Sequence, residues 1–216
     1  MKQAQPLPGY LVRRYHGWKA TDYHDNKSWY RRLSAEGQHP RAMVISCCDS
    51  RVHVTSVFRA DQGEFFVHRN IANLVPPHAP DAECHGTAAA VEYAVCALKV
   101  AHLIVLGHSG CGGVSGCHDM CMGRAPELEA PSSFVGRWIG ILRPGFERVK
   151  HISDDAERRR ALEKEAVLQS LHNLMTFPFV AGAVAQGDLS LHGLWYDIGE
   201  GVLEAYDADT GGYMPV

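Results

Sequence analysis

Long apolar runs are absent from the sequence. No segment approaches the roughly 18 apolar residues that a membrane-spanning helix needs. The N-terminal stretch MKQAQPLPGYLVRRYHGWKA also lacks the continuous apolar core of a secretory signal peptide. Both absences speak against export and against a membrane partner, so we expect a cytoplasmic protein.

An excess of positive charge is missing as well. The chain of 216 residues carries 21 Lys and Arg against 24 Asp and Glu, a formal net charge of -3. Domains that bind nucleic acid usually present a basic patch or stripe, so we expect no nucleic-acid partner. Hydrophobic residues make up 46% of the chain, which is ordinary for a globular domain with its own core.

Repeats, low-complexity segments and long linkers are also absent. A chain of this length fits a single domain, and we expect a helical arm at residues 1–36 followed by an α/β core at residues 37–216. The cysteines number seven, which is odd, and no export signal precedes them. This combination argues against a disulfide framework and favours free thiols or metal ligands.

Apolar runs alternate with helical patterns along the core. Strands are expected at residues 41–47, 64–70 and 101–109, and two more around the turn IGEG within residues 189–209. Helices are expected at residues 27–36, 85–100, 132–149 and 154–175, with Thr87 as the N-cap of the second. This order predicts an α/β fold, with a mainly parallel sheet of about four strands, an antiparallel edge strand and flanking helices.

Two of the predicted strands end in groups that bind metals. AMVISC runs into CDSR, and HLIVLG runs into HSGCGG, and the functional residues of parallel sheets gather at the carboxyl ends of the strands. His108, Cys111 and one cysteine of the first motif would make three ligands, the pattern of a catalytic zinc with an open fourth position. The glycine-rich segment could instead be a plain turn or a phosphate cradle, but it lacks the Gly-Lys-Ser/Thr ending of a P-loop.

Strand geometry separates the two adjacent cysteines. Successive side chains of a strand face opposite ways, so Cys47 and Cys48 cannot both face one pocket. If the extension persists, Cys47, Asp49 and Arg51 share a side, and Cys48 points away towards packing. Asp49 and Arg51 can then pair, which lowers the pKa of the carboxyl group and keeps it a hydrogen-bond acceptor.

Four segments together resemble the β-class carbonic anhydrases, in particular their plant-like branch. Cys-x-Asp-Ser-Arg followed later by His-x-x-Cys-Gly-Gly is the most specific part of the resemblance. The matching segments are GQHPRAMVISCCDSRV, GEFFVHRNIANLVPP, GTAAAVEYAVCALKVAHLIVLGHSGCGGV and HGLWYDIGEGVL. They span residues 37 to about 114 almost continuously and include the C-terminal hairpin.

The resemblance implies a set of site residues. Cys47, His108 and Cys111 would be the ligands of one zinc ion per chain, with Asp49 and Arg51 as the pair beside the metal. The substrate pocket would be lined, partly from a neighbouring subunit, by Gln38, Phe66, Ile71, Tyr93 and the backbone N–H of Gly112.

The implied function is the reversible hydration of carbon dioxide to bicarbonate and a proton, by attack of zinc-bound hydroxide. Asp49 would accept a hydrogen bond from that hydroxide and orient it. Val44 occupies the position where members with a regulatory bicarbonate site carry tryptophan, so we expect a zinc centre that Asp49 does not ligate. The resemblance also implies self-association as a dimer or tetramer through exchanged N-terminal helices.

Several other interpretations remain open at the level of sequence. A hydrolase of carbonyl sulfide or carbon disulfide could use the same ligands, and a structural zinc module is a further alternative. Cys117, His118 and Cys121 could form a second metal site, although packing is the simpler interpretation. Arg69 is expected to hold a loop or an interface through an ion pair. Residues 157–165, ERRRALEKE, are expected to form a solvated helix face.

Overall fold

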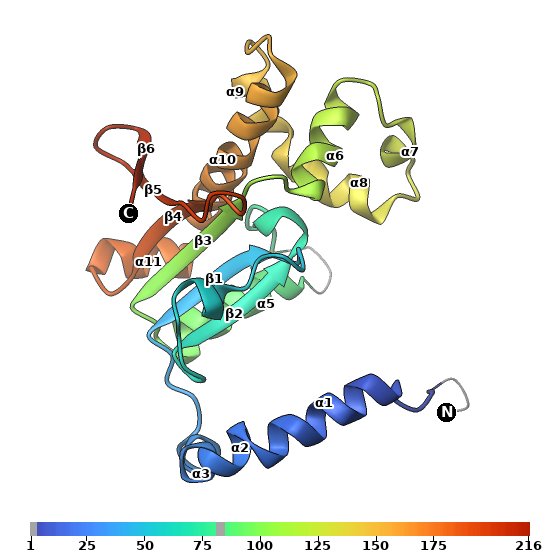
Figure 1. Cartoon of the computed structure of the whole chain (residues 1–216). Coiled ribbons are helices and arrows are strands. Elements are labelled where there is room, and N and C mark those ends of the chain that lie inside the picture. The colour runs from blue at the N-terminus through green and yellow to red at the C-terminus, as the bar shows by residue number, and fades with distance from the viewer. Residues whose placement is uncertain (1–3, 81–84) are drawn as a thin grey trace. The chain divides into compact units, whose positions relative to one another are not determined.

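The computed structural model describes residues 4–80 and 85–216 and divides into two compact units, one ending at His39 and the other running from Pro40 to Val216 (Figure 1). The first unit consists of α1 (Gly9–Ala20), α2 (Asp22–Asp25) and α3 (Lys27–Glu36). As expected, α3 ends before Gly37, whose φ of 78° suits glycine. The two units are described separately.

The helices of the first unit bury none of their residues. Aromatic rings pack on one another instead, with the ring centroid of Trp18 5.5 Å from that of Tyr23 and 5.7 Å from that of Tyr30. Large apolar side chains of α1 stay exposed, among them Tyr15 at 52% and Trp18 at 40%. A helix of this length is marginal in water by itself, so this unit lacks the buried core that usually stabilises a helix.

The second unit is built on a six-stranded sheet with the order β2-β1-β3-β4-β5-β6. The strands are β1 (Ala42–Cys47), β2 (Phe65–Asn70), β3 (His102–His108), β4 (Ser190–Tyr196), β5 (Leu203–Asp207) and β6 (Gly212–Pro215). The first four in this sheet order are parallel, and β5 and β6 are antiparallel. The predicted parallel strands and hairpin are confirmed, while β6 was not predicted, because GGYMPV is short and contains glycine and proline.

Helices and single turns cover the sheet. The helices are α4 (Val54–Val57), α5 (Gly86–Glu92), α6 (Gly112–Cys121), α7 (Pro126–Glu129), α8 (Phe134–Ile139), α9 (Arg143–Val149), α10 (Asp155–Leu174) and α11 (Pro178–Gln186). The turns are η1 (Ile71–Asn73), the π-helical η2 (Tyr93–Ala97) and η3 (Gly140–Leu142). No helix among the described residues is long and apolar enough to cross a membrane.

The prediction that Thr87 is the N-cap of the helix expected at residues 85–100 is wrong. The N-cap of α5 is His85, and its side chain makes no capping hydrogen bond. The hydroxyl group of Thr87 instead lies 3.0 Å from Nε2 of His68 on β2. A tertiary hydrogen bond thus takes the hydroxyl group that local propensity assigns to the helix end.

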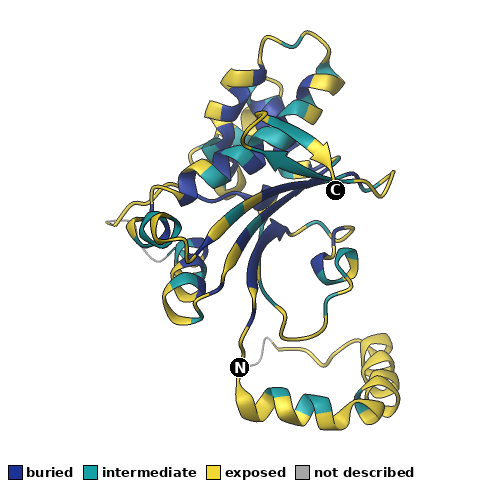
Figure 2. Ribbon diagram, turned by 90° about the vertical axis from the view of Figure 1, so that its left-hand side faces the viewer, coloured by how far each residue is buried: buried dark blue, intermediate teal, exposed yellow. Residues whose placement is uncertain are grey.

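The core lies on both faces of the sheet, and the central strands are buried along most of their length (Figure 2). One face, with Met43 and Ile45, packs against side chains from α5, α10 and α11. The opposite face, with Val44 and Leu106, packs against Val54 and the β5 strand. Each fully buried aliphatic side chain contributes about 1.5–3 kcal/mol, so the carboxyl ends of β1 and β3 are held on a rigid base.

Candidate metal centre

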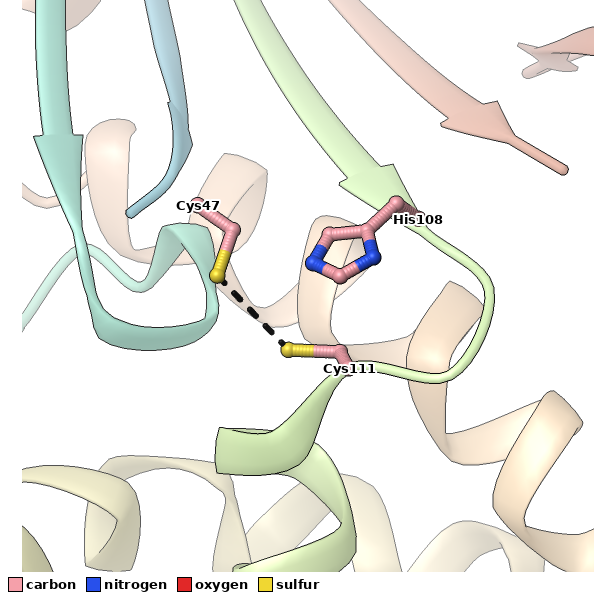
Figure 3. Close-up of side chains that lie close together, drawn as sticks. All are labelled: Cys47, His108 and Cys111. Carbon is pink, nitrogen blue, oxygen red and sulfur yellow. Dashed lines mark hydrogen bonds between the residues drawn. The ribbon is translucent and has the colours of Figure 1, made fainter. Parts of the chain in front are cut away.

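The side chains of Cys47, His108 and Cys111 converge (Figure 3). Cys47 is the last residue of β1, His108 is the last of β3, and Cys111 immediately precedes α6. All three are buried, and one ligand atom from each lies within 4.8 Å of the others. Within the described residues, 4–80 and 85–216, they form the only such group of three metal-binding side chains.

The donor set fits a zinc ion. Nδ1 of His108 lies 2.9 Å from the carbonyl oxygen of Ser109, so this nitrogen carries the proton and Nε2 presents its lone pair. Nε2 is buried and has no hydrogen-bond partner among the described residues, a costly arrangement unless a ligand meets it. Two sulfur atoms 3.8 Å apart and one free imidazole nitrogen are donors that zinc prefers.

The two cysteine side chains affect each other's pKa. The hydrogen bond between Sγ of Cys47 and Sγ of Cys111, 3.8 Å apart, lowers the pKa of Cys47, although burial of Cys47 opposes this. The same contact, together with burial, raises the pKa of Cys111. For His108, burial lowers the pKa, but the nearby Cys47 sulfur and the hydrogen bond to the carbonyl oxygen of Ser109 outweigh it and raise the pKa overall. The cluster therefore favours a thiolate at Cys47, and thiolate is the form in which cysteine binds metals.

Asp49 lies beside this cluster and is held by Arg51. Nε of Arg51 donates to Oδ1 of Asp49 at 3.0 Å, and Nη2 donates to Oδ2 at 2.7 Å. The same Nη2 also donates to the carbonyl oxygen of Gly110 at 3.0 Å. Oδ2 of Asp49 is 3.9 Å from Nε2 of His108. The hydrogen bonds from Arg51 keep the pKa of Asp49 well below its usual range, so its carboxylate can only accept hydrogen bonds.

Arg69 fixes the segment that carries these residues. Its Nε donates to the carbonyl oxygen of Cys47 at 2.9 Å, and its Nη2 donates to those of Asp49 at 2.7 Å and Val52 at 2.9 Å. The sequence predicts that Arg69 holds a loop or an interface through an ion pair; it holds a loop, but its bonds are not ion pairs. The bonds go to backbone carbonyl groups, which residue patterns alone do not reveal.

Glu163 of α10 is a site residue that sequence reasoning missed. It is buried, its Oε1 accepts a 2.7 Å hydrogen bond from the backbone N–H of Gly110, and its Oε2 accepts one of 3.3 Å from the indole of Trp195. Burial raises the pKa of Glu163. The run ERRRALEKE suggests a solvated face, but Glu163 follows buried Leu162 and precedes buried Ala166. Its place on the apolar stripe was the available signal.

The predicted pocket residues fall into separate groups. The rings of Phe66 and Tyr93 pack together with centroids 5.8 Å apart. Ile71 lies next to the glycine-rich turn, where a Cβ on Gly113 would sit 2.6 Å from its Cγ2. Gly112 is the first residue of α6. Gln38, which is exposed, belongs to the first unit and is described apart from the cluster.

Phe66 shares the sheet face of Cys47 at some distance from it. In the parallel register, Cys47 pairs with Asn70, whereas Phe66 pairs with Met43. Residues two and four apart on a strand face the same side, so Phe66 lies further back along the face that ends at Cys47. Tyr93 is 49% exposed and Ile71 is 40% exposed, which leaves this apolar face open in the single chain.

Two expectations about the other cysteines have clear outcomes. Cys48 is exposed, so the prediction that it points towards packing is wrong; the strand ends at Cys47. Cys117 is buried in the core, and Nε2 of His118 accepts a hydrogen bond from Arg158 at 2.9 Å. Within the described part of the chain, Cys117, His118 and Cys121 do not form a metal-binding group.

Comparison with known proteins identifies a family. Residues 42–203 match the family model described as carbonic anhydrase. Beta carbonic anhydrase 3 of Arabidopsis thaliana is 36% identical over 196 residues, which cover 89% of this chain and 74% of that protein.

Solved structures agree with this finding. The β-carbonic anhydrase CcaA is 31% identical with a TM-score of 0.86, covering 96% of this chain and 91% of its own. One of two tetrameric β-carbonic anhydrases from Sordaria macrospora is also 31% identical, with a TM-score of 0.74 and coverage of 91% and 95%.

Proposed function

The chain belongs to the β-carbonic anhydrases, the family that hydrates carbon dioxide reversibly with zinc, and we propose that Cys47, His108 and Cys111 hold its metal. The observation that carries this proposal is the convergence of two thiols and an unpartnered imidazole nitrogen within 4.8 Å. Zinc bound there would activate a water molecule for attack on carbon dioxide near neutral pH.

Asp49 and Arg51 orient the nucleophile in this proposal. A carboxylate that carries no proton accepts a hydrogen bond from the attacking water and directs its lone pair towards the substrate carbon. Arg51 keeps Asp49 in that form through two hydrogen bonds of 3.0 and 2.7 Å. Because Asp49 is also tied to this arginine, we propose that it stays beside the metal and does not ligate it.

The substrate pocket is proposed from its chemistry. Phe66, Ile71 and Tyr93 offer apolar surface, which suits a linear molecule of low polarity and excludes water. The N–H of Gly112, in the first turn of α6, can donate to the oxygen on which negative charge develops. We retain Gln38 as a further donor on the sequence resemblance.

We further propose one core domain with an N-terminal arm, residues 1–36, that packs on a second copy of the chain. Support comes from the exposed apolar side chains of α1, such as Leu11, Tyr15 and Trp18, and from the tetrameric relatives of Sordaria macrospora. A dimer or a tetramer fits both observations. We also propose that the protein is cytoplasmic.

The ligand assignment is tested by single serine substitutions. Cys47→Ser is expected to reduce zinc to well below one ion per chain and to abolish carbon dioxide hydration in stopped flow. Cys48→Ser is the matched control and should keep both zinc and activity, because Cys48 is exposed. Loss of zinc in Cys48→Ser together with its retention in Cys47→Ser would reverse the assignment.

A further inference from the structure

Two histidines face each other at the end of the sheet opposite the metal centre. His102 is the first residue of β3, and His192 lies on the neighbouring parallel strand β4. Nδ1 of His102 is 3.1 Å from Nε2 of His192, and both residues are exposed. The strand register pairs Ile104 with His192, so both imidazoles stand on the same face of the sheet.

The spacing of the two nitrogens matches a chelating pair. Two imidazole nitrogens that bind one ion at about 2.1 Å lie about 3.0 Å apart at a right angle and about 3.4 Å apart at a tetrahedral angle. The observed 3.1 Å lies within this range. Because the two rings come from adjacent strands of a hydrogen-bonded sheet, the backbone positions of both residues are fixed without an ordered loop.

The protonation of the pair is compatible with a cation. Partial burial, followed by the neighbouring His102, lowers the pKa of His192, so that ring is neutral at neutral pH. A neutral imidazole presents one lone pair. Two such lone pairs can point at one cation instead of sharing a proton between the two rings. Exposure of both rings leaves room for water to complete the coordination.

We propose that His102 and His192 form a second cation site, which takes a divalent transition-metal ion with a preference for imidazole, such as Ni²⁺ or Zn²⁺. The site is separate from the thiolate centre, because His108 lies at the other end of the same strand, about 20 Å away at roughly 3.3 Å per residue. An ion bound there joins β3 to β4 at their amino ends and stabilises the folded chain by mass action.

The test uses the full chain loaded with one equivalent of zinc and titrated with Ni²⁺ at pH 7.5 by isothermal calorimetry. The wild type is expected to bind Ni²⁺ at one dominant site, and His192→Gln or His102→Gln to weaken that binding by at least about tenfold, since each removes one of two ligands. His151→Gln changes an exposed histidine elsewhere and should leave the affinity unchanged. Added Ni²⁺ should also raise the unfolding temperature of the wild type more than that of the double variant.

Zinc content and the rate of carbon dioxide hydration, measured on the same samples before Ni²⁺ is added, show whether each variant is folded. Equal Ni²⁺ affinity in the wild type and in the His102→Gln/His192→Gln double variant would overturn the proposal. The same holds if the wild type binds no Ni²⁺, which would mean that the two rings only share a hydrogen bond.

Discussion

Asp49 is fixed by three hydrogen bonds from a single residue, Arg51, one of which comes from the backbone N–H. Such a carboxylate has little freedom to turn, and its hydrogen-bonding role is set by its charge. An amide at the same place would present an N–H where the proposed mechanism needs an acceptor. The catalytic contribution of Asp49 should therefore depend on its charge more than on its shape.

We expect Asp49→Asn to lower kcat/KM for carbon dioxide hydration by about 10²-fold while zinc stays bound, because loss of the hydrogen bond that orients the attacking water misplaces it, and misplacement by about 1 Å costs about 10²-fold. Stopped-flow rates and zinc content measured on one preparation check this. Full activity in Asp49→Asn would remove Asp49 from the mechanism.

Glu163 carries a second prediction at this scale. Glu163→Ala leaves the N–H groups of Gly110 and Trp195 without their acceptor, and an unsatisfied buried donor costs about 1–3 kcal/mol. We expect urea unfolding to show that the free energy of unfolding falls by that amount, and a chelator to remove zinc more easily than from the wild type. Glu163→Gln keeps an oxygen for Gly110 and should lose less on both measures; equal losses would show that charge, not the hydrogen bond, matters.

His118 gives the chain a titratable group inside its core. Nε of Arg158 donates to its Nε2 at 2.9 Å, and Nη2 of Arg124 lies 3.0 Å from its Nδ1. Burial, followed by the positive charge of Arg159, lowers the pKa of His118 below 6.5. The unfolded chain therefore takes up a proton before the folded chain does as the pH falls.

We expect the free energy of unfolding to decrease as the pH drops below about 6.5, with a contribution from His118 of at most about 1.4 kcal/mol per pH unit. His118→Gln should reduce this slope, and the exposed control His151→Gln should not. Urea unfolding between pH 5 and 7.5 measures how the free energy of unfolding depends on pH. Identical slopes in the wild type and His118→Gln would contradict the assignment.

At the scale of elements, α6 and η1 approach each other too closely for a side chain between them. A Cβ on Gly113 would meet Cγ2 of Ile71 at 2.6 Å and Cβ of Ala72 at 3.0 Å, whereas one on Gly112 would meet nothing within 4 Å. The glycine pair after Cys111 therefore contains one glycine required by packing and one that packing does not require.

Gly113→Ala is expected to destabilise the fold by about 1–3 kcal/mol, the usual cost of overpacking, and to displace Ile71. Gly112→Ala, the matched control for stability, should change the free energy of unfolding by much less. Thermal and urea unfolding of both variants test this. Equal effects would mean that α6 moves away from η1 freely.

The predictable parts of the fold are those with strong local patterns. β1, β3 and α10 have apolar runs or a helical stripe, and α10 begins with an Asp154 side chain that accepts from the N–H of Glu157. The convergence of Cys47, His108 and Cys111 was predictable because both motifs stand at strand ends. The role of Glu163 and the hydrogen bonds of Arg69 were not predictable. Both side chains bond to backbone groups that only tertiary packing brings near them.

At the scale of the whole molecule, the first unit gives the clearest reason for assembly. Its helices bury no residue, and apolar side chains on α1 remain in contact with water. Since burial of such side chains drives association, we propose that this surface is covered by another copy.

We expect the Leu11→Glu/Tyr15→Glu double variant to raise the dissociation constant of self-association by at least about tenfold, because it places charge in an apolar contact. Sedimentation velocity over a range of protein concentrations measures this. Lys27→Glu, an exposed residue of α3, is the control. Unchanged association in the double variant would show that α1 is not at the interface.

The hydrogen bond from Gly110 to Glu163 also has a consequence for the order of synthesis. All three proposed metal ligands have been translated when the chain reaches Cys111, but the Glu163 carboxylate that holds the glycine turn comes about 50 residues later. At roughly 5–20 residues per second, the ribosome takes about 3–10 s to add that segment. During this interval the nascent chain has the proposed ligands but lacks the Glu163 carboxylate, so the proposed zinc site is completed late in translation.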